Sequence, residues 1–553
     1  MPPWFQLDKA QVLISLRPVH WAVLKLAVSE RGARAVLSAV VLAAAGLLLF
    51  ARLGHYALWD DEALTALSAE GILATGDTTA MVGHNLAAYR GGLCLRGLHD
   101  RSTPPLPAYL TAASFALFGK GPWAARLPFA LCGLACVSLI LWWLYKTDTD
   151  WWTWTTASLA LIGNVSLFLY ARQCRYYAVA ILASVVIAFL YLRRDGRRAS
   201  LWWLALWSCV LFAANYLNYV VLYGCLALDY LVWGRRRQPL KSSDWLVLLA
   251  PQILICGMIA IVWNPFQTGI SSAYSTTLPL HRLKLFWWNF RDLNTCEFGV
   301  GLLLLAGAVL ALLPRGEWLR RATLGLLAFV ALETLLSPQP VDESTRVADV
   351  RYIAPVIPLC IAIGVLAIRA ATAKARWLAL PLALAAFGTN LLHGGPWLPG
   401  GLRSSLAAYA GELRHPPGDP FMAAAAWINA NVREFQSVLV EPAFMMYPLM
   451  FHAPKPIYAW QLDSPPRGQF ANLAPIHFKL AEPPEFIVGF GPFAGRAMTA
   501  IRGWNPSLSY QQVATLDQFW MCVYRPELFW RSFKPIENFD REREAIYIFR
   551  RRL

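Results

Sequence analysis

The chain has 553 residues, of which 57% are hydrophobic and 15% are charged. A water-soluble protein, with about 25% charged residues, cannot hide this much apolar surface, whereas a lipid bilayer solvates it directly. The formal net charge of +16 does not indicate a nucleic-acid partner, because the basic residues form short clusters between apolar blocks, as in the cytoplasmic loops of membrane proteins.

Residues 1–34 carry basic residues interleaved with apolar ones. This pattern predicts a cytoplasmic amphipathic segment on the membrane surface, followed by a first span that acts as an uncleaved anchor. Together with the later apolar blocks, it predicts an α-helical transmembrane domain over residues 35–392. The blocks lie at residues 35–53, 105–118, 127–145, 152–170, 176–192, 200–216, 217–233, 245–264, 298–313, 322–337, 352–368 and 377–392.

Four basic clusters mark the loops that we expect on the cytoplasmic side. If these loops are cytoplasmic, successive spans must cross the membrane in alternating directions. This is possible only if block 105–118 stays outside the bilayer core. That block has about 14 residues, fewer than the about 17–25 that a spanning helix needs, so we expect it in the outer interface. About eleven spans remain, with the N-terminus inside and the C-terminus outside. The clusters are Arg193/Arg194/Arg197/Arg198, Arg235/Arg236/Arg237/Lys241, Arg315/Arg320/Arg321 and Arg369/Lys374/Arg376.

The same topology places the C-terminal tail, residues 393–553, on the outer face. In this tail, short β-rich runs such as SVLVEP and EFIVGFG alternate with helix-like stretches such as FMAAAAWINANV. Such alternation predicts a small soluble α/β domain. The other outer segments are residues 54–126, 171–175, 265–297 and 338–351.

The first outer loop begins with three consecutive carboxylates, Asp60, Asp61 and Glu62. Acidic residues are common in the first turn of a helix, because they complement its dipole. Carboxylates at a membrane surface are also costly to desolvate, and they are therefore candidates for a functional site. The loop alone fits a solvated helix start as well as it fits a catalytic site.

Two further outer segments contain arginines. Arg172 and Arg175 lie in the turn LYARQCRYYA, and Arg351 precedes Tyr352 at the start of the tenth span. Arginine and tyrosine at this depth often anchor a helix in the interface. Arginine also binds phosphate through two parallel hydrogen bonds. Acids in one loop and arginines in two others supply a general base for a hydroxyl and cations for a phosphate leaving group.

Several short motifs follow one another in order along the outer face. They are Asp61-Glu62-Ala63, Gly76-Asp77, Pro104-Pro105-Leu106, Phe118-Gly119, Ala125-Arg126-Leu127-Pro128, Arg172 with Arg175-Tyr176, and Arg351-Tyr352 with Pro355 and Pro358. In this order they resemble the bacterial members of the protein O-mannosyltransferase and aminoarabinose (lipid A) transferase superfamily. The resemblance implies the C-type glycosyltransferase fold, a polyprenyl-phosphate-linked sugar as donor and transfer at the outer face of the bacterial inner membrane.

The resemblance also implies that Asp61 lies at the catalytic centre, with Glu62 beside it and Asp60 as an additional neighbour. Two departures from the family pattern matter. Many relatives carry Lys before the Pro-Pro pair, where this chain has Ser102-Thr103, so phosphate binding falls to the arginines. The aminoarabinose enzymes carry an acid in the turn after the third span, where this chain has Gln173-Cys174, which argues against a specific assignment to lipid A modification.

The resulting hypothesis is an inverting glycosyltransferase in which Asp61 is the general base. Arg172, Arg175 and Arg351, with Tyr352 beside them, are the predicted ligands of the donor phosphate. Glu62 or Asp60 is expected to orient the acceptor or, with Asp61, to hold a divalent metal such as Mg or Mn, since hard cations prefer oxygen ligands.

The 265–297 loop, with His281, Arg282 and Lys284, is predicted to close over the donor as a lid. The acceptor class is left open between a lipid, a glycan and a protein. A transporter or flippase of lipid-linked sugars is the main alternative function, and a membrane scaffold is a third. Transporters carry charges within spans and inverted repeats, whereas most charges here lie in loops and the sequence shows no repeat.

Overall fold

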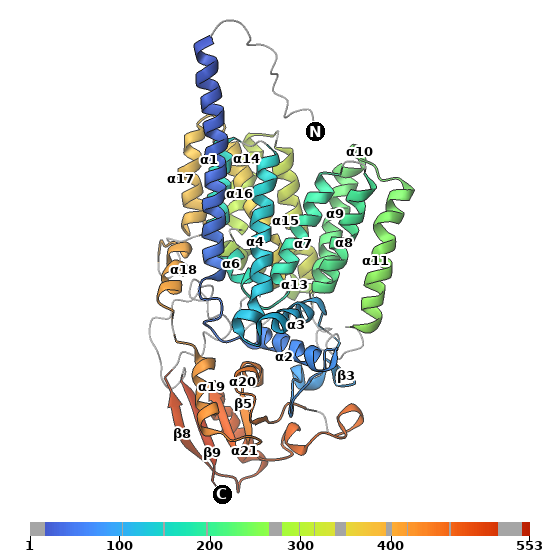
Figure 1. The fold of residues 1–553 in the computed structure, drawn as a ribbon, viewed down its shortest axis with the longest axis vertical. Coiled ribbons are helices and arrows are strands. Elements are labelled where there is room, and N and C mark those ends of the chain that lie inside the picture. The colour runs from blue at the N-terminus through green and yellow to red at the C-terminus, as the bar shows by residue number, and fades with distance from the viewer. Residues whose placement is uncertain are drawn as a thin grey trace.

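The computed structural model describes residues 17–552 except 102, 148–149, 195–196, 265–278, 298, 315, 338–349, 394–400, 417, 464–465 and 518–544. Long helices form a bundle, and a smaller part that contains a β-sheet lies beyond one end of it (Figure 1). Helices α2 (Asp60–Thr75) and α3 (Leu106–Phe118) lie between the two parts. The predicted fold class, a helical membrane domain followed by an α/β domain, is confirmed.

Each predicted span coincides with a helix or with a run of short helices. Leucine, valine, isoleucine and alanine dominate these segments, and a helix satisfies its own backbone where no water is available. The bundle helices are α1 (Arg17–Phe50), α4 (Pro122–Lys146), α5 (Trp151–Gly163), α6 (Val165–Ala171), α7 (Tyr177–Leu192), α8 (Arg198–Ala214), α9 (Tyr216–Asp229), α11 (Ser242–Val262), α13 (Pro279–Glu297), α14 (Gly299–Leu312), α15 (Glu317–Leu336), α16 (Ile357–Ala371) and α17 (Ala379–Ala383).

Among the described residues, five helices are long and apolar enough to cross a membrane alone. They become six if α5 and α6, which meet at 53°, form one broken span. The bend falls at Asn164, whose side chain accepts a hydrogen bond from the Leu167 amide and caps α6. Other predicted spans are shorter apolar helices, so the total of about eleven remains a prediction. Helix α3 lies at the end of the bundle and not among the spans, as the loop alternation predicts.

The second half of the predicted 265–297 loop is a helix, α13. Its sequence mixes charges with aromatic residues, which explains why it was mistaken for a loop, but Leu285 and Trp288 are buried at a helical spacing. Residues 265–278, the first half of the segment, lie outside the described residues.

The C-terminal part contains a five-stranded sheet of order β6-β5-β7-β9-β8. Strands β6 (Ile457–Tyr458), β5 (Ser437–Glu441) and β7 (Phe486–Phe490) are parallel, and β9 (Ile546–Arg551) and β8 (Tyr510–Leu516) add antiparallel strands. The runs SVLVEP, EFIVGFG and AIYIFR supply β5, β7 and β9. Packed against the sheet or near the bundle are α18 (Ser405–Arg414), α19 (Pro420–Asn431), α20 (Met446–His452) and α21 (Phe493–Trp504).

The segment that joins α1 to α2 is held by the C-terminal part. The amide of Ala57 donates to Asp419 Oδ2 at 2.6 Å, and the amide of Leu58 donates to His452 Nε2 at 3.2 Å. Burial and nearby positive charge lower the pKa of His452 to about 4, so its neutral ring is available as an acceptor. The sheet domain therefore fixes the start of α2 relative to the bundle.

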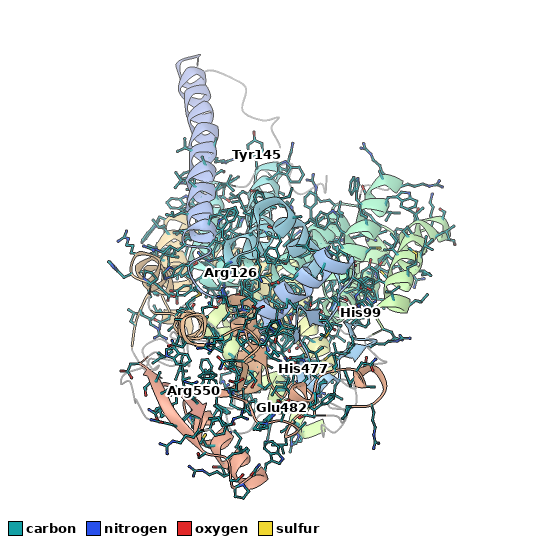
Figure 2. All side chains as sticks on the ribbon, turned by 60° about the horizontal axis from the view of Figure 1, so that its bottom comes forward. His99, Arg126, Tyr145, His477, Glu482 and Arg550 are labelled. Carbon is teal, nitrogen blue, oxygen red and sulfur yellow. The ribbon has the colours of Figure 1, made fainter. Side chains whose placement is uncertain are left out.

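Basic residues gather at the other end of the bundle. Helix α10 (Arg235–Arg237), which belongs to a predicted cytoplasmic cluster, lies opposite the sheet domain (Figure 1). Helix α4 connects the two ends, with Arg126 near the junction and Tyr145 at the far end (Figure 2). This arrangement agrees with the predicted alternation of spans, while the assignment of either end to the cytoplasm remains a prediction.

Candidate active site

The three acidic residues of the first outer loop form the first turn of α2. Negative charge is favourable at a helix N-terminus, which is one reason why the helix begins at Asp60. With 3.6 residues per turn, successive side chains point in directions about 100° apart. Asp60, Asp61 and Glu62 consequently have different partners and do not converge on one point.

Glu62 is fully buried and is paired with Arg126 of α4. Arg126 Nε donates to Glu62 Oε1 at 2.9 Å, and Nη2 donates to Oε2 at 2.5 Å. The amide of Cys174 also donates to Oε1 at 2.7 Å. The remaining Arg126 donors reach the carbonyl oxygens of Leu53, Tyr56 and Ala57. Glu62 thus ties α2 to α4 and to the Arg172–Arg175 turn, a placement that does not support its predicted role in acceptor orientation.

Asp61 lies between two arginines from distant parts of the chain. Arg351 Nη1 donates to Asp61 Oδ2 at 2.7 Å, and Arg175 Nη2 lies 3.6 Å from Oδ1. Burial opposes ionisation of Asp61, but the positive charges of Arg175 and Arg351 outweigh it and lower the pKa of this carboxyl. The guanidinium of Arg351 also lies 5.3 Å from the ring of Tyr352. The structure therefore brings together four of the predicted site residues.

Asp60 faces a different environment. Its Oδ1 accepts the Asp61 amide at 2.6 Å. Burial, reinforced by the neighbouring charge of Asp61, raises the pKa of Asp60 to about 8. One charged and one largely neutral carboxyl group therefore stand side by side near neutral pH.

Two tyrosines that the sequence did not single out, the partly buried Tyr89 and the buried Tyr447, interact electrostatically with these acids. Burial and the charge of Asp61 raise the pKa of Tyr89, which lies in the first outer loop. Burial, with the charges of neighbouring groups that include Asp60, raises the pKa of Tyr447 on α20. The C-terminal part thus contributes to the electrostatic surroundings of the acids, through a residue distant in sequence that no local pattern reveals.

Arg172 points away from this group. Its side chain is 3% exposed, and Nη1 donates to the carbonyl oxygens of Leu48 and Ala51 at 2.8 and 2.9 Å. The guanidinium also lies over the ring of Tyr409. Cations are favourable at a helix C-terminus, and Arg172 caps the C-terminal end of α1. This position does not support its predicted role as a phosphate ligand.

The predicted lid residues lie on α13. Arg282 Nη1 donates to the carbonyl oxygens of Ser337 and Thr334 at 2.7 and 3.3 Å, and it caps the end of α15. His281 and Lys284 lie on the same first turns of α13. Helical structure and an anchored arginine do not support a mobile lid over Asp61.

A narrow cavity of about 10 Å³, large enough for one water molecule, lies beside Arg175. It is lined by residues of α2, of the loop before α3 and of the α6–α7 turn, among them Thr65, Thr78, Asp100, Thr103, Pro105 and Arg175. Thr103, directly before the Pro-Pro pair, donates to Asp100 Oδ2 at 2.5 Å. Arg175 Nη1 contacts Thr65 Oγ1 at 3.1 Å. Arg175 is therefore the cation that faces this cavity.

The arginine partners of Asp61 and Glu62 do not fit a divalent metal held by these two acids. Both carboxylate oxygens of Glu62 bind Arg126, and those of Asp61 face Arg175 and Arg351. Guanidinium partners repel a divalent cation, and within the described part of the chain no group of three or more His, Cys, Asp or Glu residues is placed to hold one.

Comparison with known proteins shows the fold and gives a family match to part of the chain. Residues 102–263, from the loop before α3 to the end of α11, match the model of the dolichyl-phosphate-mannose-protein mannosyltransferase family. No curated protein sequence matches the chain. The apo crystal structure of ArnT from Cupriavidus metallidurans is similar, with a TM-score of 0.55 and 16% identity over 88% of this chain and 96% of that one.

Two further solved structures also match the chain. ArnT from the same organism bound to undecaprenyl phosphate gives a TM-score of 0.54 and 16% identity over 94% of this chain and 98% of that one. Archaeal oligosaccharyltransferase AglB from Archaeoglobus fulgidus, in complex with an inhibitory peptide and a dolichol-phosphate, gives a TM-score of 0.38. Its sequence identity is 13%, over 83% of this chain and 69% of that one. The likeness to ArnT shows the fold, and the family match over residues 102–263 agrees with the resemblance to protein O-mannosyltransferases that the motifs indicate.

Proposed function

We propose that this chain is a glycosyltransferase that moves a sugar from a polyprenyl-phosphate donor to an acceptor hydroxyl. The observation that carries the proposal is the group formed by Asp61, Arg175 and Arg351 at the end of the helix bundle. It combines a carboxylate that accepts a proton with two cations that bind a phosphate, next to a cavity. ArnT, whose fold the chain shares, has been solved with undecaprenyl phosphate, which supports a lipid phosphate as the donor's carrier.

Binding of the donor phosphate to the two arginines activates Asp61 as a base. Without donor, Arg175 and Arg351 lower the pKa of Asp61 and make it a weak base. A donor phosphate that binds these guanidinium groups neutralises part of their charge, and the pKa of Asp61 then rises toward its ordinary value. The base is thus strongest when the donor is in place.

The transfer itself needs one bond to form and one to break. The acceptor O–H gives its proton to Asp61 as the oxygen attacks the anomeric carbon. The bond between that carbon and the phosphate oxygen breaks with inversion, and its electron pair stays on the phosphate, where Arg175 and Arg351 stabilise the charge. Polyprenyl phosphate and the glycosylated acceptor are the products. The residues do not fit a divalent metal, and no step uses one.

The proposal places the reaction at the outer face of a bacterial inner membrane, where the sheet domain is periplasmic and the N-terminus is cytoplasmic. A lipid-linked donor suits a compartment without nucleotide sugars. The acceptor is a hydroxyl of a lipid, a glycan or a protein. Mass spectrometry of envelope glycolipids, glycans and proteins, with and without the gene, identifies the sugar and the acceptor by the mass that disappears.

A reconstituted system tests the proposal against the competing function, a flippase of lipid-linked sugars. Purified protein in vesicles receives a polyprenyl-phosphate sugar labelled in its lipid, together with envelope extract as a source of acceptors. A transferase releases free polyprenyl phosphate in proportion to enzyme. Movement of intact labelled donor between leaflets, without release of lipid phosphate, would refute the proposal.

A further inference from the structure

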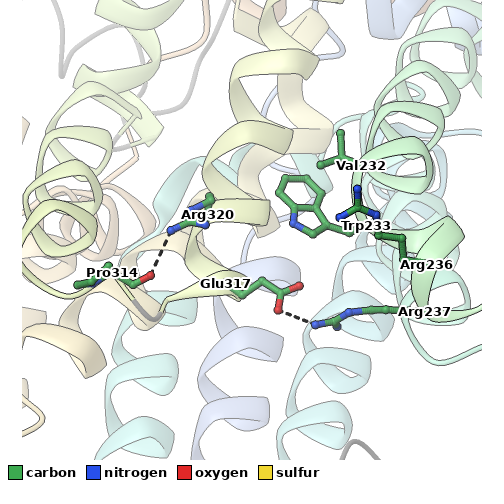
Figure 3. Close-up of a pocket in the computed structure, with 7 residues that line it drawn as sticks. All are labelled: Val232, Trp233, Arg236, Arg237, Pro314, Glu317 and Arg320. Carbon is green, nitrogen blue, oxygen red and sulfur yellow. Dashed lines mark hydrogen bonds and ion pairs between the residues drawn. The ribbon is translucent and has the colours of Figure 1, made fainter.

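Two of the basic clusters, far apart in sequence, meet at the end of the bundle opposite the candidate active site. One belongs to the helical run α9, η3 (Tyr230–Gly234) and α10, and the other to the start of α15. Between them lies a cavity of about 410 Å³, which we call the basic cavity (Figure 3). It is lined by Val232, Trp233, Arg236, Arg237, Pro314, Glu317 and Arg320.

The basic cavity carries an excess of positive charge. Arg237 Nη2 lies 2.5 Å from Glu317 Oε2, so these two charges offset each other. Arg320 donates to the carbonyl oxygen of Pro314 at 3.1 Å, which positions its guanidinium but leaves its charge uncompensated. Arg236 makes no hydrogen bond or ion pair within the described part of the chain. Two guanidinium charges are therefore available to an anion.

Hydrogen bonds link the helices that lie next to these arginines. Arg321, next to Arg320 on α15, pairs with Asp229 of α9 through two hydrogen bonds of 2.9 and 2.7 Å. Tyr191 of α7 donates to the same carboxylate at 2.8 Å. Because these bonds join α9 to α15, the helices next to Arg236 and Arg320 need little rearrangement when an anion bridges the two side chains.

Exposed apolar side chains lie near the basic cavity in the sequence. Val232, which lines the cavity, is 52% exposed, its neighbour Leu231 is 65% exposed, and Leu312, two residues before the lining Pro314, is 80% exposed. In a chain that spans a membrane, such side chains face acyl tails. Trp233, which also lines the cavity, has the amphipathic ring that is typical of the level of lipid headgroups. The ligand that satisfies arginines on one side and exposed leucines on the other is a phospholipid.

We propose that the basic cavity binds the headgroup phosphate of an anionic phospholipid in the leaflet opposite the candidate active site. The phosphate bridges Arg236 and Arg320, and the acyl chains lie along Leu231 and Leu312. Basic pockets between membrane helices bind anionic headgroups in this way. The bound lipid fastens the ends of α9 and α15 together. This site does not depend on the proposed transferase activity.

Native mass spectrometry of the full-length protein in detergent tests the proposal. Phosphatidylglycerol and phosphatidylcholine are the probes, and the variants are R236Q/R320Q and the control R198Q/R235Q. The control removes the same charge from exposed arginines outside the cavity. We expect the affinity for phosphatidylglycerol to fall about fivefold for each charge removed from the cavity, with less than a twofold change in the control. Phosphatidylcholine binding should not change.

Two further variants keep the test decisive. R236Q removes a guanidinium that has no hydrogen bond or ion pair among the residues the structure describes, so it should lower phosphatidylglycerol affinity without lowering the melting temperature in lipid-free detergent. E317Q removes a carboxylate that lines the cavity and should raise the affinity several-fold. Equal losses in the cavity and control variants would overturn the proposal. Displacement of phosphatidylglycerol by millimolar inorganic phosphate would also overturn it, in favour of a soluble anion.

Discussion

The guanidinium of Arg351 lies 2.7 Å from the carboxylate of Asp61, although 290 positions separate the two residues. Arg351 belongs to the short helix η5 (Val350–Val356) that leads into α16, whereas Asp61 belongs to the first turn of α2. The pair therefore joins the first outer loop to one of the last helices of the bundle. A proton acceptor and a phosphate ligand are held at contact distance before any substrate is present.

Replacement of Asp61 by Asn tests its role as the base. The amide keeps the size of the side chain and an acceptor for Arg351, but it cannot take up a proton. We expect turnover to fall by about 10²–10⁴-fold, with the melting temperature close to that of the wild type. Release of labelled polyprenyl phosphate measures the rate. D463N, at a carboxylate that is 70% exposed in the C-terminal part, is the matched control and should retain activity. Full turnover by D61N would remove the proposed base.

Replacement of Arg351 by Gln should affect both donor binding and the pH profile. Loss of one guanidinium weakens the grip on the donor phosphate and raises KM for the donor. It also removes part of the charge that lowers the pKa of Asp61, so the pKa of that carboxyl rises. Activity on the acid side should then be lost at a higher pH than in the wild type. R351K, which keeps the charge, should restore the acid limb of the kcat/KM profile. An unshifted acid limb in R351Q would contradict the electrostatic link.

Breaking the ion pair of Glu62 and Arg126 should lower the stability of the protein. E62Q leaves a buried guanidinium without its counter-charge, which typically costs about 3–5 kcal/mol. Thermal unfolding in detergent should show a large decrease in melting temperature. E70Q is the control, because Glu70 pairs with the 40% exposed Lys120 and its loss should cost at most about 1 kcal/mol. If E62Q were as stable as the wild type yet inactive, Glu62 would act on substrate instead.

The fold was predictable where one physical property dominates. Long apolar blocks and the strands β5 and β7 were identified because burial on both faces leaves a continuous apolar run. Strand β9 was identified from its Ile, Tyr and Phe residues, although its buried and partly buried positions alternate. Strand β8 was missed, since its residues YQQVATL are mostly polar and lie at the edge of the sheet. Helix α13 was missed because its charges obscured its helical spacing.

The residues of the site were predictable from the sequence, but the directions in which their side chains point were not. Asp61, Arg175, Arg351 and Tyr352 meet as expected. Arg172 and Arg175 stand three positions apart in one turn, and no local pattern shows that the first caps α1 and the second faces Asp61. Arg126 was part of a quoted motif, but its bond to Glu62 depends on how α2 packs against α4. Tertiary packing decides these directions.

The raised pKa of Asp60 predicts that the free energy of unfolding decreases as the pH rises. Its pKa is about 8 in the folded protein and near 3.8 in an unfolded chain, so the folded state binds the extra proton between these values. Stability from this group is complete below pH 4 and is lost progressively as the pH rises toward 8. D60N cannot ionise, so its melting temperature should vary less over this interval and exceed that of the wild type at pH 8. Parallel curves for both proteins would show that Asp60 does not titrate there.

The contrast between Arg172 and Arg175 allows the same substitution to separate a structural arginine from a phosphate ligand. R172Q removes the donor that caps the Leu48 and Ala51 carbonyl groups, and buried carbonyl groups without a donor cost about 1–3 kcal/mol. Its melting temperature should fall, while the fraction that stays folded keeps the wild-type KM for the donor. R175Q should behave in the opposite way, with a nearly unchanged melting temperature and a KM raised about tenfold or more, because a charge-assisted bond to phosphate contributes about 1.5–3 kcal/mol. A raised donor KM in R172Q at a temperature where it is fully folded would return that residue to the phosphate site.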